Sequence, residues 1–354
     1  MENHNTDASS QDEAILTTTH FQFTGKAGEF FRIWIVNFAL TIVTLGIYSA
    51  WAKVRQQQYF YGNTLFGGKP FQYLATPMQI LIGRLITAGL LIAFFLLNYL
   101  QSPAAGFLIL AFVLAMPALF VSSLRFNYRN TAHRNVKFAF TGSIAQGYWY
   151  FLILPVLCSL PLFLFMPYAI RQQRAFIVNH IKWGDKEFTC EPPIKNYYIL
   201  FLSMYVAMGV MVGGMFAVTK SLGAGGQPDM TNPAFVLVFL MMYLAMFYIG
   251  IAVKAYLFKW SLQYSKLAGH QVITQLKPSR YVFVAVTNFL AIGLTLGLML
   301  PWAKIRMARF LLETSALEAP ANFISEVEAT HQKENSAIGQ EVADGLDVEI
   351  GFGL

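Results

Sequence analysis

The chain has 354 residues, of which 56% are hydrophobic and only 12% are charged. A soluble domain carries about 25% charged residues, so this composition excludes a protein whose whole surface faces water and indicates one embedded in lipid. The formal net charge is +7. Because Lys and Arg stand in short clusters beside apolar runs, as membrane topology signals do, we expect anionic lipid headgroups as partners and no nucleic acid.

Three regions follow along the chain. Residues 1–19 are predicted to form a disordered acidic tail, residues 20–315 a multi-pass membrane domain, and residues 316–354 an acidic, mostly disordered tail. A membrane span needs about 18 or more predominantly apolar residues. The apolar runs predicted to span the membrane are residues 30–48, 78–100, 104–124, 148–170, 197–218, 233–253 and 281–300. The expected fold is therefore an all-α polytopic bundle of about seven helices.

One stretch occurs twice. Residues 37–55 read NFALTIVTLGIYSAWAKVR, and residues 288–306 read NFLAIGLTLGLMLPWAKIR. Each is an apolar run that contains one Asn near its start and ends in Trp-Ala-Lys-x-Arg. We interpret the two stretches as copies of one unit.

The loops also recur. Residues 61–71 and 128–138 share Tyr, Asn, Thr and Phe at equal spacing, residues 179–188 are similar, and residues 264–276 form a weaker copy. Alternating residues around Asn and Gly are typical of β-hairpins, so we expect small hairpins at the membrane interfaces. Matching segments before the first and fourth runs predict a repeat of three spans, and an odd number of spans would invert successive repeats.

These motifs together resemble a known family. The segments WAKVRQQQYFYGNTLFGGKPF, RNTAHRNVKFAFTG and TLGLMLPWAKIRMARF are similar to the YjgN-like family of bacterial inner-membrane proteins, a family of unknown function. The resemblance covers about residues 20–315. It implies a multi-pass protein of the bacterial inner membrane and supplies no catalytic or binding residues.

The orientation in the membrane is left open by the charges. With seven spans, 12 of the 25 Lys and Arg residues fall on the side of the N-terminal tail, so the positive-inside rule does not decide between the sides. Inverted repeats would produce this balance, and so would a re-entrant run at residues 148–170 with most hairpins on one side. We favour an outer N-terminal tail and an inner C-terminal tail.

Three polar residues within the predicted spans are candidate sites. Asn37 and Asn288 share a helix face with Thr44 and Thr295, and a polar side chain in hydrocarbon needs a partner. The two asparagines are predicted to make interhelical hydrogen bonds, or alternatively to line a polar cavity. Arg84, two turns into its span, either snorkels to the interface or coordinates an anion.

The two Trp-Ala-Lys-x-Arg ends are the other candidate sites. Each places an indole beside two cations and is predicted to anchor the chain at the interface. The alternative is a pocket for an anionic lipid headgroup. The residues concerned are Trp51, Lys53, Arg55, Trp302, Lys304 and Arg306.

Catalytic patterns are missing from the sequence. No Asp, Glu or His lies inside a predicted span, and no hydrolase, phosphate-loop or metal-ligand motif is present. We therefore expect no enzyme, no cofactor and no metal site. The sequence is compatible with two functions. One is transport or lipid handling, and the alternative is a scaffold that docks an unidentified protein partner through its hairpins.

Overall fold

The computed structural model describes residues 16–161, 163–222 and 231–330. In these residues ten short strands pair in a closed antiparallel barrel, in the order β1-β10-β9-β8-β7-β6-β5-β4-β3-β2. The strands are β1 (Leu16–Phe23), β2 (Thr64–Phe66), β3 (Lys69–Tyr73), β4 (Thr131–His133), β5 (Val136–Phe140), β6 (Ile181–Trp183), β7 (Lys186–Cys190), β8 (Ser265–Leu267), β9 (His270–Thr274) and β10 (Ser315–Pro320).

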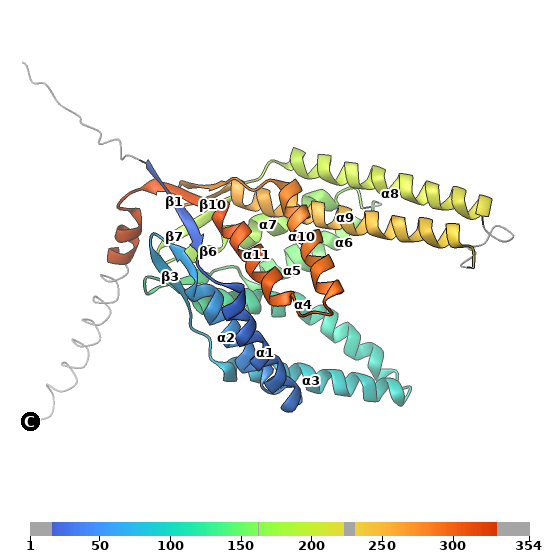
Figure 1. The fold of residues 1–354 in the computed structure, drawn as a ribbon, viewed down its shortest axis with the longest axis horizontal. Helices are drawn as coiled ribbons and strands as arrows, with labels where there is room; N and C mark the ends of the chain where they lie inside the picture. Colours follow the sequence, from blue (N-terminus) through green and yellow to red (C-terminus); the bar gives the residue numbers. More distant parts are fainter. Residues whose placement is uncertain (1–15, 162, 223–230, 331–354) are drawn as a thin grey trace, which may run out of the picture.

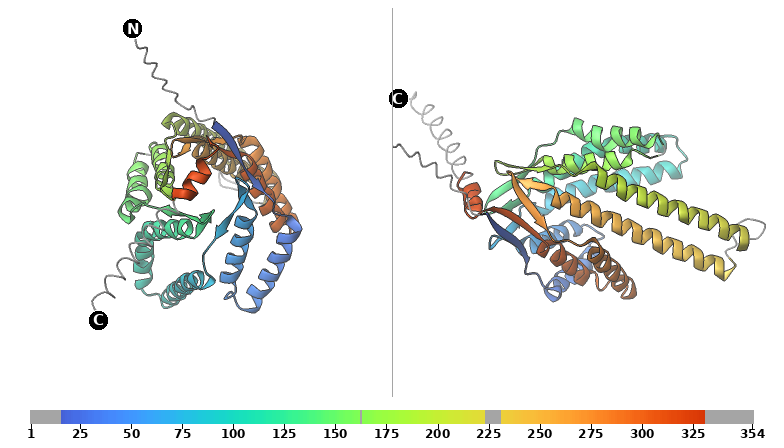
Figure 2. Two further views of the ribbon diagram at one scale, coloured as in Figure 1. Left: turned by 90° about the vertical axis from the view of Figure 1, so that its left-hand side faces the viewer. Right: turned by 90° about the horizontal axis from the view of Figure 1, so that it is seen from above.

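Helices, arranged in pairs, fill every second interval between the strands. They are α1 (Ala27–Val43), α2 (Ser49–Gly62), α3 (Pro77–Tyr99), α4 (Ala104–Arg129), α5 (Ile144–Tyr148), the π-helix η1 (Trp149–Ile153), α6 (Leu154–Ser159), α7 (Met166–Asn179), α8 (Ile194–Leu222), α9 (Pro233–Gln263), α10 (Pro278–Leu294) and α11 (Leu300–Glu313). Figure 1 shows the helices extending in one direction from the barrel, and the left view of Figure 2 shows them arranged around it.

The order strand, helix pair, strand occurs five times in the described residues. The continuous stretch of α5, η1 and α6 acts as the first helix of its pair. We call each such strand, helix pair and strand a segment. Tight turns join each segment to the next, as at Gly67-Gly68 between β2 and β3. All hairpin turns therefore lie at one end of the barrel and all helix pairs at the other.

The barrel overturns the predicted all-α fold. The hairpins occur where the alternating sequence predicts them, but they do not remain separate small elements. Each pairs with its neighbour, as where Phe71 of β3 lies opposite His133 of β4. Closing the sheet removes the unpaired edges that isolated hairpins would expose.

The prediction of seven spans is also wrong. Four described helices are long and apolar enough to cross a membrane, namely α3, α4, α8 and α9. The predicted runs 30–48, 148–170 and 281–300 instead belong to pairs of short helices that turn back towards the barrel. The predicted three-span repeat fails for the same reason. The recurring segment contains two helices, so the chain returns to the barrel after each segment and consecutive segments are not inverted.

The turn between α1 and α2 explains why the first run does not continue. Leu45 and Gly46 have positive φ angles of 50° and 92°, which end the helix. The hydroxyl of Thr44 donates to the carbonyl of Leu40 (2.7 Å) and accepts from the amide of Tyr48 (3.0 Å). Thr44 therefore stabilises the turn itself, and Leu45 projects from its tip with 94% of its surface exposed.

The turn between α10 and α11 is built in the same way. Leu296 and Gly297 have φ angles of 48° and 94°. The hydroxyl of Thr295 donates to the carbonyl of Ala291 (2.6 Å) and accepts from the amide of Met299 (3.1 Å). Leu296 is 96% exposed. The duplicated sequence thus specifies two copies of one apolar turn.

The middle short pair turns by another route. Helix α6 ends at Ser159, Phe163 adopts a positive φ of 61°, and α7 begins at Met166 with Pro167 in its first turn. Proline lacks an amide hydrogen, so it is tolerated at the start of a helix and disruptive inside one. The prolines of this run therefore help to end one helix and start the next.

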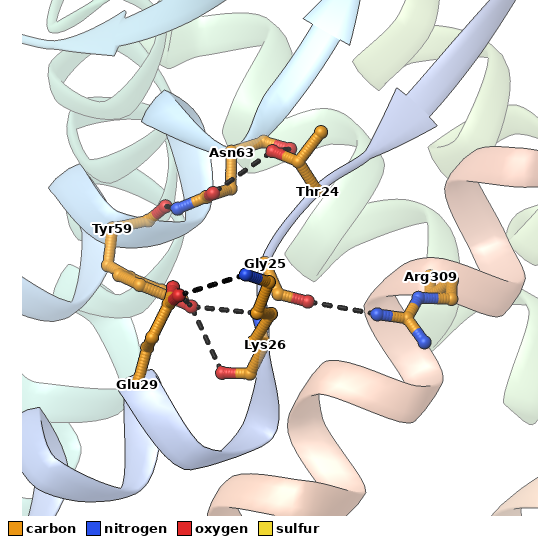
Figure 3. A network of polar contacts seen from close by, with 7 residues as sticks. All are labelled: Thr24, Gly25, Lys26, Glu29, Tyr59, Asn63 and Arg309. Carbon is orange, nitrogen blue, oxygen red and sulfur yellow. Dashed lines mark hydrogen bonds and ion pairs between the residues drawn. The ribbon is translucent and has the colours of Figure 1, made fainter.

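Arginines join neighbouring segments where a strand meets its helix (Figure 3). Arg309 of α11 donates to the carbonyl of Gly25, between β1 and α1, at 3.0 Å. There the hydroxyl of Tyr59 accepts from the amide of Lys26 (2.9 Å) and donates to Glu29 (3.1 Å). Arg125 of α4 makes the matching contact with the carbonyl of Gly142 at 2.8 Å.

The recurrent asparagines hold the hairpins on their helices. The side-chain amides of Asn63 and Asn130 each donate to the backbone carbonyl four residues earlier, at 2.8 and 2.7 Å. Asn63 also accepts from the hydroxyl of Thr24 (3.0 Å), and the Asn179 side chain accepts from the amide of Cys190 (2.5 Å). These contacts account for the Asn pattern by local structure.

A short helix covers the hairpin end of the barrel. Residues 323–330 are helical, Val327 is fully buried, and Phe323 is 3% exposed. Two ion pairs tie this terminal helix to hairpin turns, Arg134 with Glu328 (3.2 Å) and Lys186 with Glu326 (3.4 Å). The buried cluster beneath it consists of Phe66, Val136, Trp183, Leu267, Leu317 and Ala319.

All of β10 except Ser315, and the terminal helix, fall within the predicted tail 316–354. The rest of that tail, residues 331–354, lies outside the described residues, as do residues 1–15 of the predicted N-terminal tail. Leu16 to Thr19 of that tail belong to β1.

Candidate functional site

Three predicted site residues come together in one pocket. Asn37, Lys53 and Arg84 line a space of about 240 Å³ between α1, α2 and α3. The turn at Leu45 folds α2 back against α1. It thereby brings Asn37 of α1 close to Lys53 of α2, although the two residues are far apart in the sequence. The other lining residues are Phe30, Trp34, Phe38, Thr41, Ser49, Ala52 and Gln56.

Asn37 has an unsatisfied polar atom in this pocket. Its residue surface is 6% exposed, and its Oδ1 makes no hydrogen bond to any described residue. Leaving a buried acceptor without a donor costs roughly 1–3 kcal/mol. A bound group that donates a hydrogen bond would remove this cost.

The pocket is also positively charged. Lys53 and Arg84 line it, and Lys304 of α11 donates to Oε1 of Gln56 at 3.3 Å. Burial lowers the pKa of Lys304, and the charge of Lys53 lowers it further. An anion bound here would therefore interact favourably with cations that now repel each other.

Asn288 has a different environment. Its Nδ2 donates to the carbonyl of Ala303 (3.0 Å), and its Oδ1 accepts from Arg306 (3.0 Å), which also donates to Thr287 (2.7 Å). The Arg306 guanidinium lies over the ring of Trp302 at 5.1 Å. The predicted hydrogen bonds of Asn288 are therefore present, but within one helix pair, and Asn288 is absent from the lining of the Asn37 pocket.

The remaining predicted residues lie outside this pocket. Trp51 is partly exposed and stacks against Tyr48, with ring centroids 6.2 Å apart. Arg55 is exposed. Of the first Trp-Ala-Lys-x-Arg end, Ala52 and Lys53 line the pocket, and Trp51 and Arg55 do not.

Gln56 and Trp34 also belong to this site, and the sequence reasoning missed them. Trp34 precedes Asn37 by three residues, about one helical turn, and Gln56 follows Lys53 at the same spacing. Helical spacing around Asn37 and Lys53 could therefore have identified both. The contact between α11 and Gln56, however, could be identified only from the structure.

Comparison with known proteins identifies the family. Residues 18–345 match the family model described as "Bacterial protein of unknown function (DUF898)". The chain belongs to this family. It is 24% identical to Inner membrane protein YjgN of Salmonella typhimurium, over 89% of this chain and 92% of the relative. It is 30% identical to Inner membrane protein YjgN of Escherichia coli O157:H7, over 40% of this chain and 35% of the relative. No solved structure matches the chain.

The predicted resemblance to YjgN-like proteins is thus confirmed. Together with the four apolar helices of sufficient length, the relatives place this protein in the bacterial inner membrane.

Proposed function

We propose that α3, α4, α8 and α9 cross the inner membrane and that the barrel lies on its cytoplasmic side. The positive-inside rule supports this orientation. Residues 100–103, which join α3 to α4 at the far ends, contain no charged residue, and Lys220 is the only basic residue described near the far ends of α8 and α9. Basic residues instead gather on and beside the barrel, at Lys69, Arg129, Arg134, Lys137, Lys182 and Lys266.

The three short helix pairs then enter the bilayer from the barrel side without crossing it. The exposed tips at Leu45 and Leu296 are apolar. Their backbone amides bond within the turn, as where the amide of Gly46 donates to the carbonyl of Thr41 (2.7 Å). Hydrocarbon tolerates non-helical backbone only when its polar groups are satisfied, so these tips are suited to the bilayer interior.

This arrangement places the Asn37 pocket near the cytoplasmic headgroups. Arg84 lies seven residues after the start of α3, about 10 Å along a helix that begins at the barrel. Lys53 and Arg84 can pair with a phosphate, and Asn37 Oδ1 can accept from a hydroxyl or ammonium group of the same headgroup. The protein is thus a lipid-handling protein that binds a phospholipid headgroup of the cytoplasmic leaflet. The unsatisfied Asn37 oxygen beside two cations is the observation that carries this proposal.

Lipid binding to purified full-length protein, measured by native mass spectrometry, tests the proposal. Phosphatidylglycerol, whose head carries hydroxyl donors, should bind more tightly than phosphatidylcholine, which has none. Arg84→Gln should weaken phosphatidylglycerol binding at least tenfold, because a charged hydrogen bond contributes about 1.5–3 kcal/mol.

Arg280→Gln provides the matched control. Arg280 is exposed on α10 outside the pocket, so the same loss of charge should leave binding unchanged. Equal binding by wild type and Arg84→Gln would refute the site.

The scaffold interpretation has less support. It assigns docking to the hairpins, but the recurrent asparagines Asn63, Asn130 and Asn179 serve local structure. In addition, the terminal helix covers part of the hairpin turns. The lipid interpretation uses residues that have no such structural role.

A further inference from the structure

A second cavity, unrelated to the Asn37 pocket, lies inside the barrel. Its volume is about 410 Å³, which falls within the range of small-molecule sites. Strand residues that line it include Phe21, Phe71, Phe138, Phe188 and Val272. Its lining is predominantly aromatic and aliphatic, so it favours an apolar ligand.

The cavity reaches from the covered end of the barrel to the helices. His133 adjoins the β4–β5 turn, beside the terminal helix, whereas Tyr128 of α4, Val178 of α7 and Leu262 of α9 contribute from the helical end. None of the described residues of the terminal helix is on the lining. The lining therefore extends from residues beside the hairpin turns to the barrel ends of α4, α7 and α9.

Two polar side chains on the lining have hydrogen-bonding atoms that the described residues leave unsatisfied. His133 is fully buried, and neither ring nitrogen makes a hydrogen bond of normal geometry to a described residue. Trp183 is 2% exposed, and its Nε1 also lacks an acceptor. Each unsatisfied group costs roughly 1–3 kcal/mol, which a ligand with matching polar groups would remove.

The two groups are compatible with an uncharged ligand. Burial, and to a smaller extent the charge of Arg134, lower the pKa of His133 to about 4. The Pro70 carbonyl and Glu328 raise this pKa, but by less than burial lowers it. At neutral pH the imidazole is therefore uncharged and presents one donor and one acceptor. Trp183 presents a donor only. Carbonyl oxygens satisfy both donors.

The aromatic side chains around these groups favour a flat ligand. The Phe71 ring lies 4.6 Å from the His133 ring, and the Phe138 ring stacks on Trp183 at 5.9 Å. Aromatic rings prefer stacked or edge-to-face contacts with other planar rings.

We propose that the barrel binds an uncharged planar ring with carbonyl groups and an apolar tail, of the quinone class. The ring lies among the aromatic side chains, its carbonyl groups accept from Trp183 and His133, and its tail extends past Val178 and Leu262 towards the membrane. Arg174, the cation on the lining, lies on α7 at the helical end and does not contact the ring. This site does not depend on the Asn37 pocket.

Isothermal titration calorimetry of the full-length protein in detergent, with ubiquinone-1 as the probe, tests this proposal. Saturable binding is expected. His133→Phe should weaken it at least tenfold while the variant remains folded, because the substitution keeps an aromatic ring and removes unsatisfied polar atoms. His270→Phe is the matched control, since His270 occupies another hairpin, packs on Phe323 and lies outside the cavity.

Val272→Trp provides a second, independent test. Val272 lines the cavity and is only partly buried, so a larger side chain there should fill the space and abolish ubiquinone-1 binding. Failure of wild type to bind ubiquinone-1, unchanged binding by His133→Phe or by Val272→Trp, or displacement of ubiquinone-1 by an equal concentration of oleate would each overturn the proposal. Loss of phosphatidylglycerol binding in Arg84→Gln with ubiquinone-1 binding intact would confirm that the two sites are separate.

Discussion

Two asparagines at matching places in the duplicated stretch have different surroundings. Asn288 Oδ1 accepts a hydrogen bond from Arg306, whereas Asn37 Oδ1 has no described partner and Arg55 is exposed. The same residue types thus form a satisfied structural contact in one segment and a pocket with an unsatisfied acceptor in the other. Sequence identity alone does not distinguish these outcomes, because the difference depends on where an arginine side chain lies.

Arg306→Gln should therefore lower the free energy of unfolding by about 1–2 kcal/mol, since Arg306 is partly buried and donates two hydrogen bonds. Arg55→Gln, its matched partner in the duplicated stretch, should change stability by less than about 0.5 kcal/mol. Unfolding measurements on both variants in one detergent check this expectation. Equal destabilisation by the two substitutions would contradict it.

His133 makes the stability of the empty barrel depend on pH. Its pKa is about 4 in the folded protein and about 6.5 in an unfolded chain, so the unfolded state binds more protons between these values. The stabilisation is complete above pH 6.5 and is lost as the pH falls towards 4. Arg134 and Glu328 are the charged groups that affect this titration.

Between pH 7 and pH 5, titration of His133 should reduce the free energy of unfolding by about 2 kcal/mol. His133→Phe cannot be protonated there and should show a correspondingly smaller decrease, which isolates this group from the carboxylates. Unfolding of both proteins at the two pH values provides the measurement. Identical pH dependence would exclude His133 as its source.

At the scale of elements, the terminal helix is held mainly by apolar contacts. Val327 is fully buried, whereas the ion pairs of Glu326 and Glu328 are partly exposed and such pairs contribute about 0–1 kcal/mol. The terminal helix should therefore detach when its apolar face is disrupted.

Val327→Asp should increase amide hydrogen exchange in residues 323–330 at least tenfold, because it places a carboxylate against the buried cluster. Ala329→Asp adds the same charge to an exposed position of the terminal helix and should leave exchange nearly unchanged. Hydrogen–deuterium exchange with peptide mapping measures both. Similar exchange in the two variants would show that the buried contact does not hold the helix.

Local patterns in the sequence were sufficient to predict several elements. The four long helices follow from apolar length, and the hairpins follow from alternation around Asn and Gly. The turn at Leu45 was missed because leucine at positive φ is rare and the Thr-Leu-Gly signal is short. The closed barrel was missed because pairing between strands of three to eight residues depends on contacts between distant segments. For the Asn37 pocket, Asn37, Lys53 and Arg84 were predicted as candidates and helical spacing could have added Gln56. The contact of Lys304 with Gln56 depends on packing between distant segments.

At the scale of the molecule, the proposed crossing of the membrane by α3, α4, α8 and α9 leaves the barrel on one side. Cys158 and Cys190 are both buried, and burial raises the pKa of Cys190, so neither native thiol is suited to labelling. Single cysteines in a variant lacking both provide better probes of sidedness.

An impermeant maleimide applied to spheroplasts should label Ser102→Cys, between α3 and α4, from outside. It should label Lys69→Cys, at the β2–β3 turn, only after the membrane is opened. Leu45→Cys should remain unlabelled in both cases until the protein is denatured, because its tip lies in hydrocarbon. External labelling of Leu45→Cys would show that the first helix pair crosses the membrane and would refute the proposed topology.

The pairing of β1 with β10 has a consequence for biogenesis. Leu16 lies opposite Pro320, and the hydroxyl of Thr17 donates to the carbonyl of Ala319, 302 residues away. During translation β1 can pair with β2 early, but its other edge has no partner until β10 leaves the ribosome. All the helix pairs are therefore synthesised, and available for insertion, before the ring of strands can close. Closure is therefore a late step of assembly, and β1 keeps one unpaired edge until β10 has been made.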